Sequence, residues 1–243
     1  MRSQRKKPVW IEAGSVPWFP SPEGYDAHGL VAGGGDLSAE RLLTAYALGI
    51  FPWYDEPPVL WWSPDPRATL EAPQLHVSRS LKRTLASGRF RVTMDHDLEG
   101  VLDGCADRPE GTWLNRDMRA AYQELASRGF LRSYEVWQGP ALVGGLYGVL
   151  LGGLFAAESM FHRATDASKV ALVTAVLHTA KCGVSVFDVQ FLTPHLTTMG
   201  AGQVPRSTYL ERVSRALHQE TRDPTFADPD SLLPWILGQL AGA

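Results

Sequence analysis

The most constraining feature of this sequence is a run of three strand-like segments between residues 133 and 158. They cover residues 133–138, 141–150 and 154–158, and the pairs Gly139-Pro140 and Gly152-Gly153 separate them. Short connections of this composition are typical of an antiparallel meander. Glycines and Glu158 interrupt the apolar stretch from 141 to 160, which therefore does not have the pattern of a membrane span.

The segments around the meander extend this pattern to an α+β fold. An apolar helix is expected over residues 167–181, with Asp166 as N-cap and Gly183 after its end. A strand buried on both faces is predicted over 184–192, and another helix over 207–219. Before the meander, strands are expected over 67–70 and 89–94, and helices over 97–105 and 116–127, the second capped by Asn115. This order favours a mixed sheet and is compatible with an N-acetyltransferase-like fold.

The first third of the chain differs from the rest. It is rich in proline and glycine and holds most of the tryptophans, and its one expected helix begins after Ser38, a suitable N-cap. Regular elements begin near residue 67. We therefore predict a small N-terminal α+β domain over residues 1–66 and an N-acetyltransferase-like catalytic domain over 67–243.

Composition limits the classes of protein that fit. Apolar residues make up 44% and charged residues 20%, as in ordinary globular proteins. The two cysteines, Cys105 and Cys182, form no CxxC pair, so neither a metal site nor a disulfide is expected, and a reducing cytoplasm fits. No apolar segment follows the basic N-terminus, so a signal peptide is not expected. A net charge of −3 argues against a generally basic protein but permits a local basic patch.

Two clusters of polar residues carry possible chemistry. Glu158 ends an apolar strand, where a carboxylate is either a satisfied strand-end acid or a functional group. Asp188 and Gln190 alternate with phenylalanine and valine, so both are expected on the same side of a central strand. An unpaired buried charge is costly. This pair therefore indicates either a structural hydrogen-bond network or a polar cleft.

Other residues suggest contact with nucleic acid. Three cations lie close together after Val77, and they are either solvated surface or phosphate contacts: Arg79, Lys82 and Arg83. Trp113 follows Gly111-Thr112 in a loop, and Trp53 follows Phe51-Pro52. Each is either a core residue or a platform on which a base stacks.

The order of these motifs resembles the leucyl/phenylalanyl-tRNA–protein transferase family. The resemblance extends from about Trp18 to Leu210 and rests on ten segments in order: Gly34-Gly-Asp-Leu-Ser38, Gly49-Ile-Phe-Pro-Trp53, Trp61-Trp-Ser-Pro-Asp-Pro-Arg67, Glu110-Gly-Thr-Trp113, Gly144-Gly-Leu-Tyr-Gly148, Gly153-Leu-Phe-Ala-Ala-Glu-Ser-Met-Phe161, Ala167-Ser-Lys169, Asp188-x-Gln190, His195 and Gly200-Ala201. The family more often has Met at position 146 and Ser at position 198.

The resemblance implies transfer of Leu, Phe or Met from aminoacyl-tRNA to the N-terminal Arg or Lys of a protein, which marks that protein for degradation by the N-end rule pathway. It also implies a monomer. Because the exchange of an ester for an amide runs downhill, no nucleotide cofactor or metal is expected, and the cysteine usage and hydropathy favour a cytoplasmic protein without membrane attachment. Trp53 and Trp113 would sandwich the 3′-terminal adenine, and the reaction centre would hold Glu158, Asp188 and Gln190.

We add hypotheses from chemistry to these roles. Asp188 and Gln190 orient the attacking amine, Asp188 accepts its proton, and Glu158 holds the cationic acceptor. An apolar pocket for the aminoacyl side chain is expected from Leu146, Phe155, Met160, Leu172 and Phe187. Arg79, Lys82 and Arg83 are the expected contacts to tRNA phosphates.

Three other functions are weighed against this one. An acyl-CoA-dependent N-acetyltransferase needs a glycine-rich pyrophosphate loop before a helix, and Arg163-Ala-Thr-Asp166 is not such a loop. A peptidoglycan-type aminoacyl-tRNA transferase shares the donor but not the acceptor. An RNA-binding module would keep the tryptophans and the basic patch without needing Glu158, Asp188 and Gln190 together.

Overall fold

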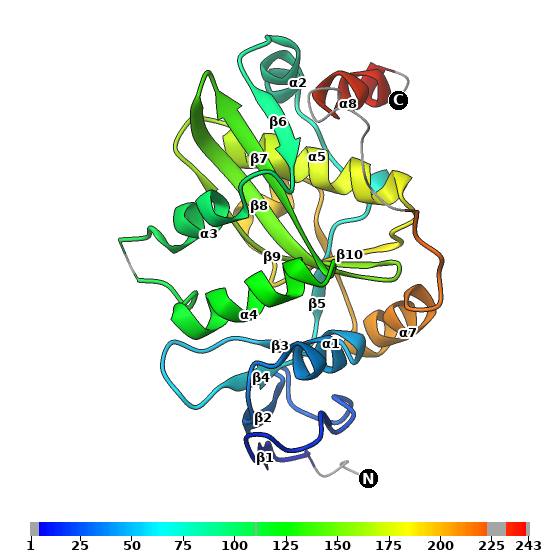
Figure 1. The fold of residues 1–243 in the computed structure, drawn as a ribbon. Coiled ribbons are helices and arrows are strands. Elements are labelled where there is room, and N and C mark those ends of the chain that lie inside the picture. The colour runs from blue at the N-terminus through cyan, green and yellow to red at the C-terminus, as the bar shows by residue number, and fades with distance from the viewer. Residues whose placement is uncertain (1–4, 110, 223–231, 242–243) are drawn as a thin grey trace.

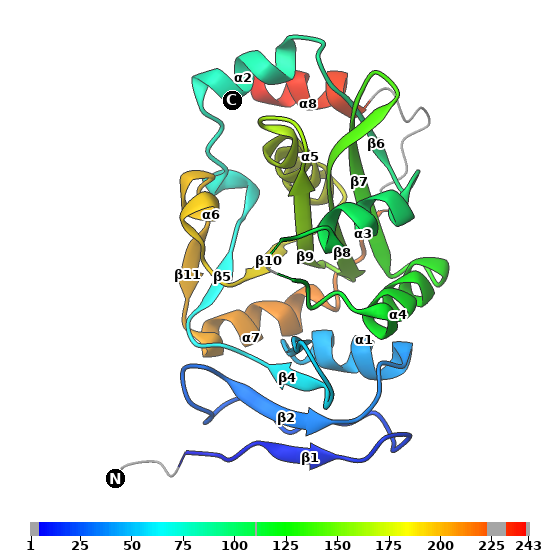
Figure 2. The same cartoon turned by 90° about the vertical axis from the view of Figure 1, so that its left-hand side faces the viewer.

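The structure is a computed structural model that describes residues 5–109, 111–222 and 232–241. Two sheets organise these residues (Figure 1): a four-stranded sheet with the order β1-β2-β4-β3 and a seven-stranded sheet with the order β11-β5-β10-β9-β8-β7-β6. The small sheet lies at one end of the molecule, and helices α1 and α7 lie between it and the large sheet (Figure 2). The predicted α+β class is confirmed.

The elements follow one another along the chain with these bounds. The strands are β1 (Val9–Ile11), β2 (Leu30–Gly34), β3 (Phe51–Pro52), β4 (Leu60–Trp62), β5 (Arg67–Thr69), β6 (Arg91–Met94), β7 (Leu131–Gln138), β8 (Ala141–Leu151), β9 (Leu154–His162), β10 (Val186–Gln190) and β11 (Gly202–Val204). The helices are α1 (Ala39–Ala47), the 3₁₀ helix η1 (Ala72–Gln74), α2 (Arg79–Ala86), α3 (Leu98–Ala106), α4 (Arg116–Ser127), α5 (Ala167–Lys181), α6 (Pro194–Thr198), α7 (Arg206–Ala216) and α8 (Leu232–Ala241).

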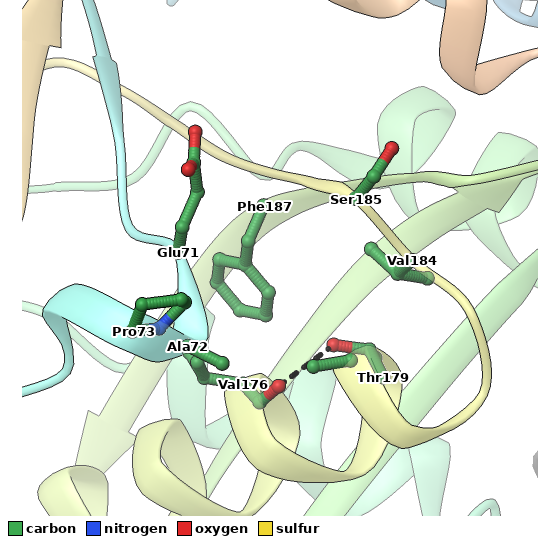
Figure 3. A pocket seen from close by; sticks show the side chains of 9 residues that line it. Glu71, Ala72, Pro73, Val176, Thr179, Val184, Ser185 and Phe187 are labelled. Atoms are coloured by element: carbon green, nitrogen blue, oxygen red, sulfur yellow. Dashed lines mark hydrogen bonds between the residues drawn. The ribbon is translucent and has the colours of Figure 1, made fainter.

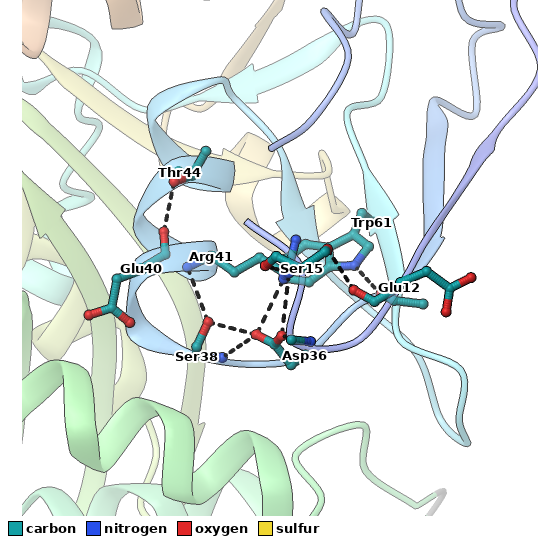
Figure 4. A network of polar contacts seen from close by, with 10 residues as sticks. Glu12, Ser15, Asp36, Ser38, Glu40, Arg41, Thr44 and Trp61 are labelled. Carbon is teal, nitrogen blue, oxygen red and sulfur yellow. Dashed lines mark hydrogen bonds and ion pairs between the residues drawn. The ribbon is translucent and has the colours of Figure 1, made fainter. Parts of the chain in front are cut away.

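Buried arginines hold the small sheet in place. The fully buried Arg41 of α1 donates hydrogen bonds to the carboxylate of Asp36 and to the carbonyl oxygen of Ser15 (Figure 4). Ser38 caps α1, as predicted. Arg206 of α7 donates to the carbonyl oxygens of Ser63 and Tyr25, at 2.7 and 2.8 Å. A charged donor that satisfies several buried carbonyls fixes the relative position of the segments that carry them.

The predicted meander is confirmed, because β7, β8 and β9 pair in antiparallel order. Glycines in β8 let helices approach both faces of the sheet. A Cβ on Gly144 would lie 2.6 Å from the Cβ of Ala167 in α5, and one on Gly145 would lie 2.9 Å from Val101 in α3. These helices therefore pack on opposite faces, because successive residues of a strand point to opposite sides.

Most expected helices form, with one correction to their capping. Asn115 caps α4 through its side chain, and Gly129 follows that helix with a φ of 81°. Asp166 precedes α5 but has a φ of 70° and makes no capping hydrogen bond. Its carboxylate instead accepts hydrogen bonds from Thr84 and Lys169. Helices α2, α6 and α8 and the strands of the small sheet were not predicted.

The neighbouring strands β9 and β10 of the large sheet separate after Ala156, early in β9, and after Asp188 in β10. Strand β10 is buried throughout, as predicted, and pairs in parallel with β9 as far as Asp188 opposite Ala156. Beyond this point no further pair joins them. Each strand also has a register shift there, so that Glu158 in β9 and Val189 in β10 have no residue opposite. Bulges of this kind redirect side chains and are common beside active sites.

None of the helices in the described ranges is both long and apolar enough to cross a bilayer.

Candidate active site

A cavity of about 410 Å³ opens where β9 and β10 separate. It combines residues from the middle of β9 and the end of β10 with β8, with the segments after β3 and α3, and with α5 and α6. Seven residues predicted from the sequence lie on its wall: Trp53, Trp113, Leu146, Glu158, Met160, Leu172 and Gln190. The other lining residues are Arg108, Ala157, Ser159, Val189, Phe191, Thr193 and Leu196.

Glu158 is the one carboxylate among the described residues that line this cavity. Its Oε2 accepts a hydrogen bond of 2.6 Å from the hydroxyl of Tyr122, which in turn lies 3.4 Å from the hydroxyl of Tyr46. Burial raises the pKa of Glu158 to about 7, and hydrogen bonds from Tyr122 and Tyr46 oppose that rise. A carboxylate with this pKa exchanges a proton readily near neutral pH.

Asp188 is fully buried and does not line the cavity. Both its oxygens bind the guanidinium of Arg67, at 2.8 and 2.6 Å, and both residues are fully buried. The hydroxyl of Tyr209 and the backbone N–H of Gln190 donate to the same carboxylate, at 2.8 and 2.9 Å. These four hydrogen bonds fill the acceptor positions of a carboxylate. The predicted role of Asp188 as proton acceptor does not fit this geometry.

Gln190 connects the buried ion pair to the cavity. Its backbone binds Asp188, it has a φ of 54°, and its amide Nε2 lies 3.4 Å from Oε1 of Glu158. A positive φ is unusual for a residue other than glycine, and such positions cluster at functional sites. Asp188 therefore positions the residue that contacts Glu158, and the three predicted polar residues belong to one network.

Trp53 and Trp113 line the same cavity from different parts of the chain. Trp53 is 44% exposed and lies edge-on to Trp62, with ring centres 6.0 Å apart. Trp113 is half-buried and lies edge-on to Tyr122 at 6.4 Å. Both rings thus have neighbours that fix their orientation. Glu110, which begins the motif before Trp113, lies outside the described residues.

The apolar wall agrees with the predicted aminoacyl pocket at three of five positions. Leu146 pairs with Met160 across β8 and β9, and both line the cavity with Leu172 of α5. Phe155 and Phe187 do not line it. Phe155 is fully buried, with its ring centre 5.0 Å from that of Phe187.

Phe187 instead lines a separate cavity of about 250 Å³, beside Glu71 and Val176 (Figure 3). Side chains alternate along a strand, so Phe187 and Val189 point away from the side occupied by Asp188. The sequence identified both phenylalanines as apolar but could not show which of them a cavity would reach.

The three predicted phosphate contacts lie away from the cavity. They are all exposed on α2, at the end of the molecule opposite the small sheet (Figure 2): Arg79, Lys82 and Arg83. Their contact with tRNA stays a prediction.

Sequence reasoning missed the partners of the predicted residues. Arg67 stands 121 positions before Asp188, and Tyr122 stands 36 before Glu158. Arg67 did end the motif Trp61-Trp-Ser-Pro-Asp-Pro-Arg67, which was the only signal of its importance. Arg108 had no signal, although it is the one cation among the described cavity-lining residues.

The described residues hold no group of His, Cys, Asp and Glu that would suit a metal ion. The groups present can bind an apolar side chain, stack an aromatic base and accept a proton from an amine. The attack of an amine on an ester requires that the two reactants are aligned, that the amine loses a proton and that a tetrahedral oxyanion is stabilised. Binding and stacking would align the ester, and the carboxylate would accept the proton.

Comparisons with known proteins agree with this chemistry. The family model for the leucyl/phenylalanyl-tRNA protein transferase matches residues 69–214, and the model for its N-terminal domain matches residues 35–65. A leucyl/phenylalanyl-tRNA–protein transferase of Anaeromyxobacter sp. (strain Fw109-5) is 53% identical over 208 residues, which cover 84% of this chain and 88% of that protein. Relatives with the same name in Oleidesulfovibrio alaskensis and Ectopseudomonas mendocina are 49% and 46% identical, and cover 89% and 88% of this chain and 91% and 97% of their own lengths.

Proposed function

Because the chain belongs to the leucyl/phenylalanyl-tRNA–protein transferase family, we propose that the cavity between β9 and β10 is where its aminoacyl transfer takes place. The protein is a transferase that moves leucine or phenylalanine from aminoacyl-tRNA to a protein. Its acceptors are proteins with N-terminal Arg or Lys, methionine is a further donor group, and the product is degraded by the N-end rule pathway. The observation that carries the proposal is the convergence of one available carboxylate, two tryptophans and an apolar wall on one cavity.

The donor spans the cavity in this proposal. Its terminal adenine lies between Trp53 and Trp113, because base–aromatic stacking is favourable for any base. Its aminoacyl side chain enters the apolar wall formed by Leu146, Met160 and Leu172. An apolar pocket discriminates by only about 1–3 kcal/mol for one methylene group, which suits an enzyme that accepts both leucine and phenylalanine. Met160 adds a flexible side chain that adapts to either group.

The acceptor amine approaches Glu158. An N-terminal α-ammonium group has a pKa of roughly 7.7–8.0, so near neutral pH part of it has already lost one proton to water. A carboxylate with a pKa of about 7 is ionised over the same range, and it can accept the second proton when the neutral amine attacks. Arg or Lys as the first residue adds a second positive charge, which the carboxylate attracts. Asp188 acts as a positioning residue, because it holds Arg67 and the backbone of Gln190.

The transfer step balances without a cofactor. The amine nitrogen attacks the ester carbonyl carbon, and the proton that it loses passes to Glu158. The N–H of the Gln190 amide that does not point to Glu158 donates to the developing oxyanion. The bond between the carbonyl carbon and the ribose oxygen then breaks, an amide remains, and Glu158 returns the proton to the ribose oxygen. Conversion of an ester to an amide is favourable, so the reaction needs no nucleotide and no metal.

The proposal is tested with radiolabelled Phe-tRNA and two peptides that differ only in a first residue of Arg or Ala. We expect label in the Arg peptide alone, and no transfer from an acyl-CoA donor. Transfer from acyl-CoA would identify the N-acetyltransferase alternative. Transfer only to a peptidoglycan peptide would identify the other aminoacyl-tRNA transferase, and binding without transfer would leave an RNA-binding module.

We also propose a domain boundary near residue 66, a monomeric state and a cytoplasmic location. The boundary is supported by the end of the small sheet at Trp62 and the start of the large sheet at Arg67. Size-exclusion chromatography with light scattering tests the monomer, and fractionation of cells tests the location.

A further inference from the structure

We propose that a second cavity, beside the reaction cavity, binds the phosphate group that joins the last two nucleotides of aminoacyl-tRNA. The inference rests on the proposed function and adds a site to it. The second cavity has a volume of about 340 Å³ and lies between α3 and the end of β9. Its lining residues are Gly104, Asp107, Arg108, Met160, Phe161, His162 and Arg163.

The two cavities adjoin each other, because Arg108 and Met160 line both. An RNA strand whose terminal adenosine occupies the reaction cavity must carry its next phosphate through a neighbouring opening. The second cavity offers that opening at the shared wall.

Arg108 presents a fixed positive charge at the junction. Its Nε donates to the carbonyl oxygen of Cys105 at 3.0 Å, and its Nη2 donates to the hydroxyl of Ser159 at 3.0 Å and to the carbonyl oxygen of Met160 at 3.3 Å. No carboxylate within the described ranges forms an ion pair with it. A guanidinium held by neutral groups keeps its charge available for an anion, and its fork of donors matches a phosphate.

Arg163 supplies a second cation on the far side of the cavity. Its guanidinium lies over the ring of Phe161, 5.3 Å from the ring centre. It also faces Asp107 at 3.7 Å, and the two side chains are 50% and 78% exposed. Water screens such a long, exposed ion pair, so a non-bridging oxygen of the phosphate can replace the carboxylate of Asp107 as the partner of Arg163. His162, exposed beside Arg163, adds a further donor.

The segment that follows the second cavity's last lining residue contacts α2. Asp166, three residues after Arg163, accepts a hydrogen bond of 3.2 Å from Thr84 of that helix. Helix α2 carries the exposed cations of the predicted basic patch: Arg79, Lys82 and Arg83. Cations therefore occur in the reaction cavity, in the second cavity and on α2, which contacts the segment that follows β9. This arrangement fits a polyanion that enters by its end, and it would repel the cationic N-terminus of the acceptor.

The test compares three Phe donors that differ in the phosphates they carry: 3′-phenylalanyl adenosine, the phenylalanyl dinucleotide CpA and phenylalanyl-tRNA. The variant is Arg163→Gln, which removes a cation that lines only the second cavity. The matched control is Arg215→Gln on α7, where the exposed arginine side chain binds the carbonyl oxygen of Glu211. Binding of unacylated CpCpA and of adenosine, measured by fluorescence, gives a readout that does not need transfer.

We expect Arg163→Gln to lower kcat/KM about tenfold with the dinucleotide and with tRNA, the size of one lost charge-assisted hydrogen bond, and to leave the adenosine donor unchanged. The affinity for CpCpA should fall equally, and its log–log salt slope should decrease by about 0.7, as for one contact to a single strand. Arg215→Gln should behave as wild type throughout.

Two results would overturn the inference. Equal loss with all three donors would mean that Arg163 supports the reaction cavity and does not bind phosphate. If Arg163→Gln kept the wild-type kcat/KM with every donor, while wild type had a higher kcat/KM with the dinucleotide than with the nucleoside, the phosphate would bind elsewhere. Failure of wild type to transfer from any donor would refute the proposed function itself, and CpCpA binding unaffected by Arg163→Gln would then exclude the phosphate site separately.

Discussion

Replacement of Glu158 by Gln should lower the slope of log(kcat/KM) against pH at acidic pH from 2 to 1. Two groups, Glu158 and the acceptor amine, must lose a proton in wild type, and only the amine must do so in the variant. Glu158 has a pKa of about 7, raised by burial, and the acceptor amine has a pKa of roughly 7.7–8.0. In wild type, log(kcat/KM) should therefore rise with a slope of 2 below pH 7, with a slope of 1 up to about pH 8, and then level off.

The size of the effect follows from these two pKa values. At pH 6 roughly a tenth of Glu158 is ionised, and on the order of one amine in sixty is neutral. Wild type should lose on the order of 600-fold between pH 8.5 and pH 6, and Glu158→Gln only on the order of 60-fold, with a slope of 1. At pH 8.5 the variant should be about 10²-fold slower than wild type, the lower end of what a general base contributes.

The assay measures single-turnover transfer from Phe-tRNA to an Arg-starting peptide between pH 5.5 and 9. Glu124→Gln, an exposed residue of α4, is the matched control and should keep the wild-type profile. A Glu158→Gln profile that still has a slope of 2, or a loss under about tenfold at pH 8.5, would refute Glu158 as the proton acceptor.

Folding stability provides an independent check on the same pKa. The folded-state pKa of Glu158 is raised, so its protonated form favours the folded state. That stability is fully present below pH 4.5 and is lost as the pH rises through 7. Glu158→Gln should therefore be more stable than wild type at pH 8, by up to about 3 kcal/mol, and lose this advantage at pH 4. Urea unfolding at both pH values measures the difference, and an equal effect at both would contradict the raised pKa.

Three further predictions concern Asp188, the two tryptophans and the cations of α2. Asp188→Asn leaves the charge of Arg67 buried and unpaired, so the free energy of unfolding measured in urea should fall by about 3–5 kcal/mol. The control Asp103→Asn at the surface should lower it by less than about 1 kcal/mol. The slope of 2 of log(kcat/KM) against pH should remain in Asp188→Asn. Trp53→Ala or Trp113→Ala should raise KM for aminoacyl-tRNA about 5- to 150-fold, which corresponds to about 1–3 kcal/mol of stacking, and an unchanged KM would remove that ring from the donor site. Substitution of all three α2 cations by Gln should reduce the log–log salt slope of tRNA binding by about 2–3, and an unchanged slope would exclude them from the interface: Arg79, Lys82 and Arg83.

The elements that the sequence predicted well are those that local patterns specify. The meander has glycine-containing turns between its apolar runs, and α4 has a side-chain cap at one end and Gly129 after the other. Helix α2 was missed because its three cations outweighed the two apolar positions that it buries, Leu81 and Leu85. The strands of the small sheet contain two to five residues each, too few for a pattern of alternation to appear. Helix α8 lies in the tail after Gln219, for which no expectation existed, and residues 223–231 of that tail lie outside the described ranges.

The sequence predicted most residues of the candidate site, but it did not predict which of them line the cavity and which hold the others in position. Alternation placed Asp188 and Gln190 on one side of a strand, and both do belong to one polar network. Arg67, 121 positions away, occupies two of the four acceptor positions of Asp188, and no local sequence pattern reveals that pairing. The two alternatives left open for this pair, a structural network and a polar cleft, both apply: the first to Asp188 and the second to Gln190.

The seam between the two sheets has a consequence for how the enzyme responds to its donor. Trp53 belongs to the N-terminal part of the chain, which Arg206 fastens to α7, whereas Trp113 stands on the part that carries the large sheet. A nucleotide held by both rings would bridge these parts, and a ligand that binds only the assembled form stabilises it by mass action. Saturating donor should then raise the melting temperature of the protein, whose buried core contains residues of both parts. Conversely, a substitution of Arg206 that removes its hydrogen bonds to Ser63 and Tyr25 would lower the rate of transfer, although Arg206 does not line the reaction cavity.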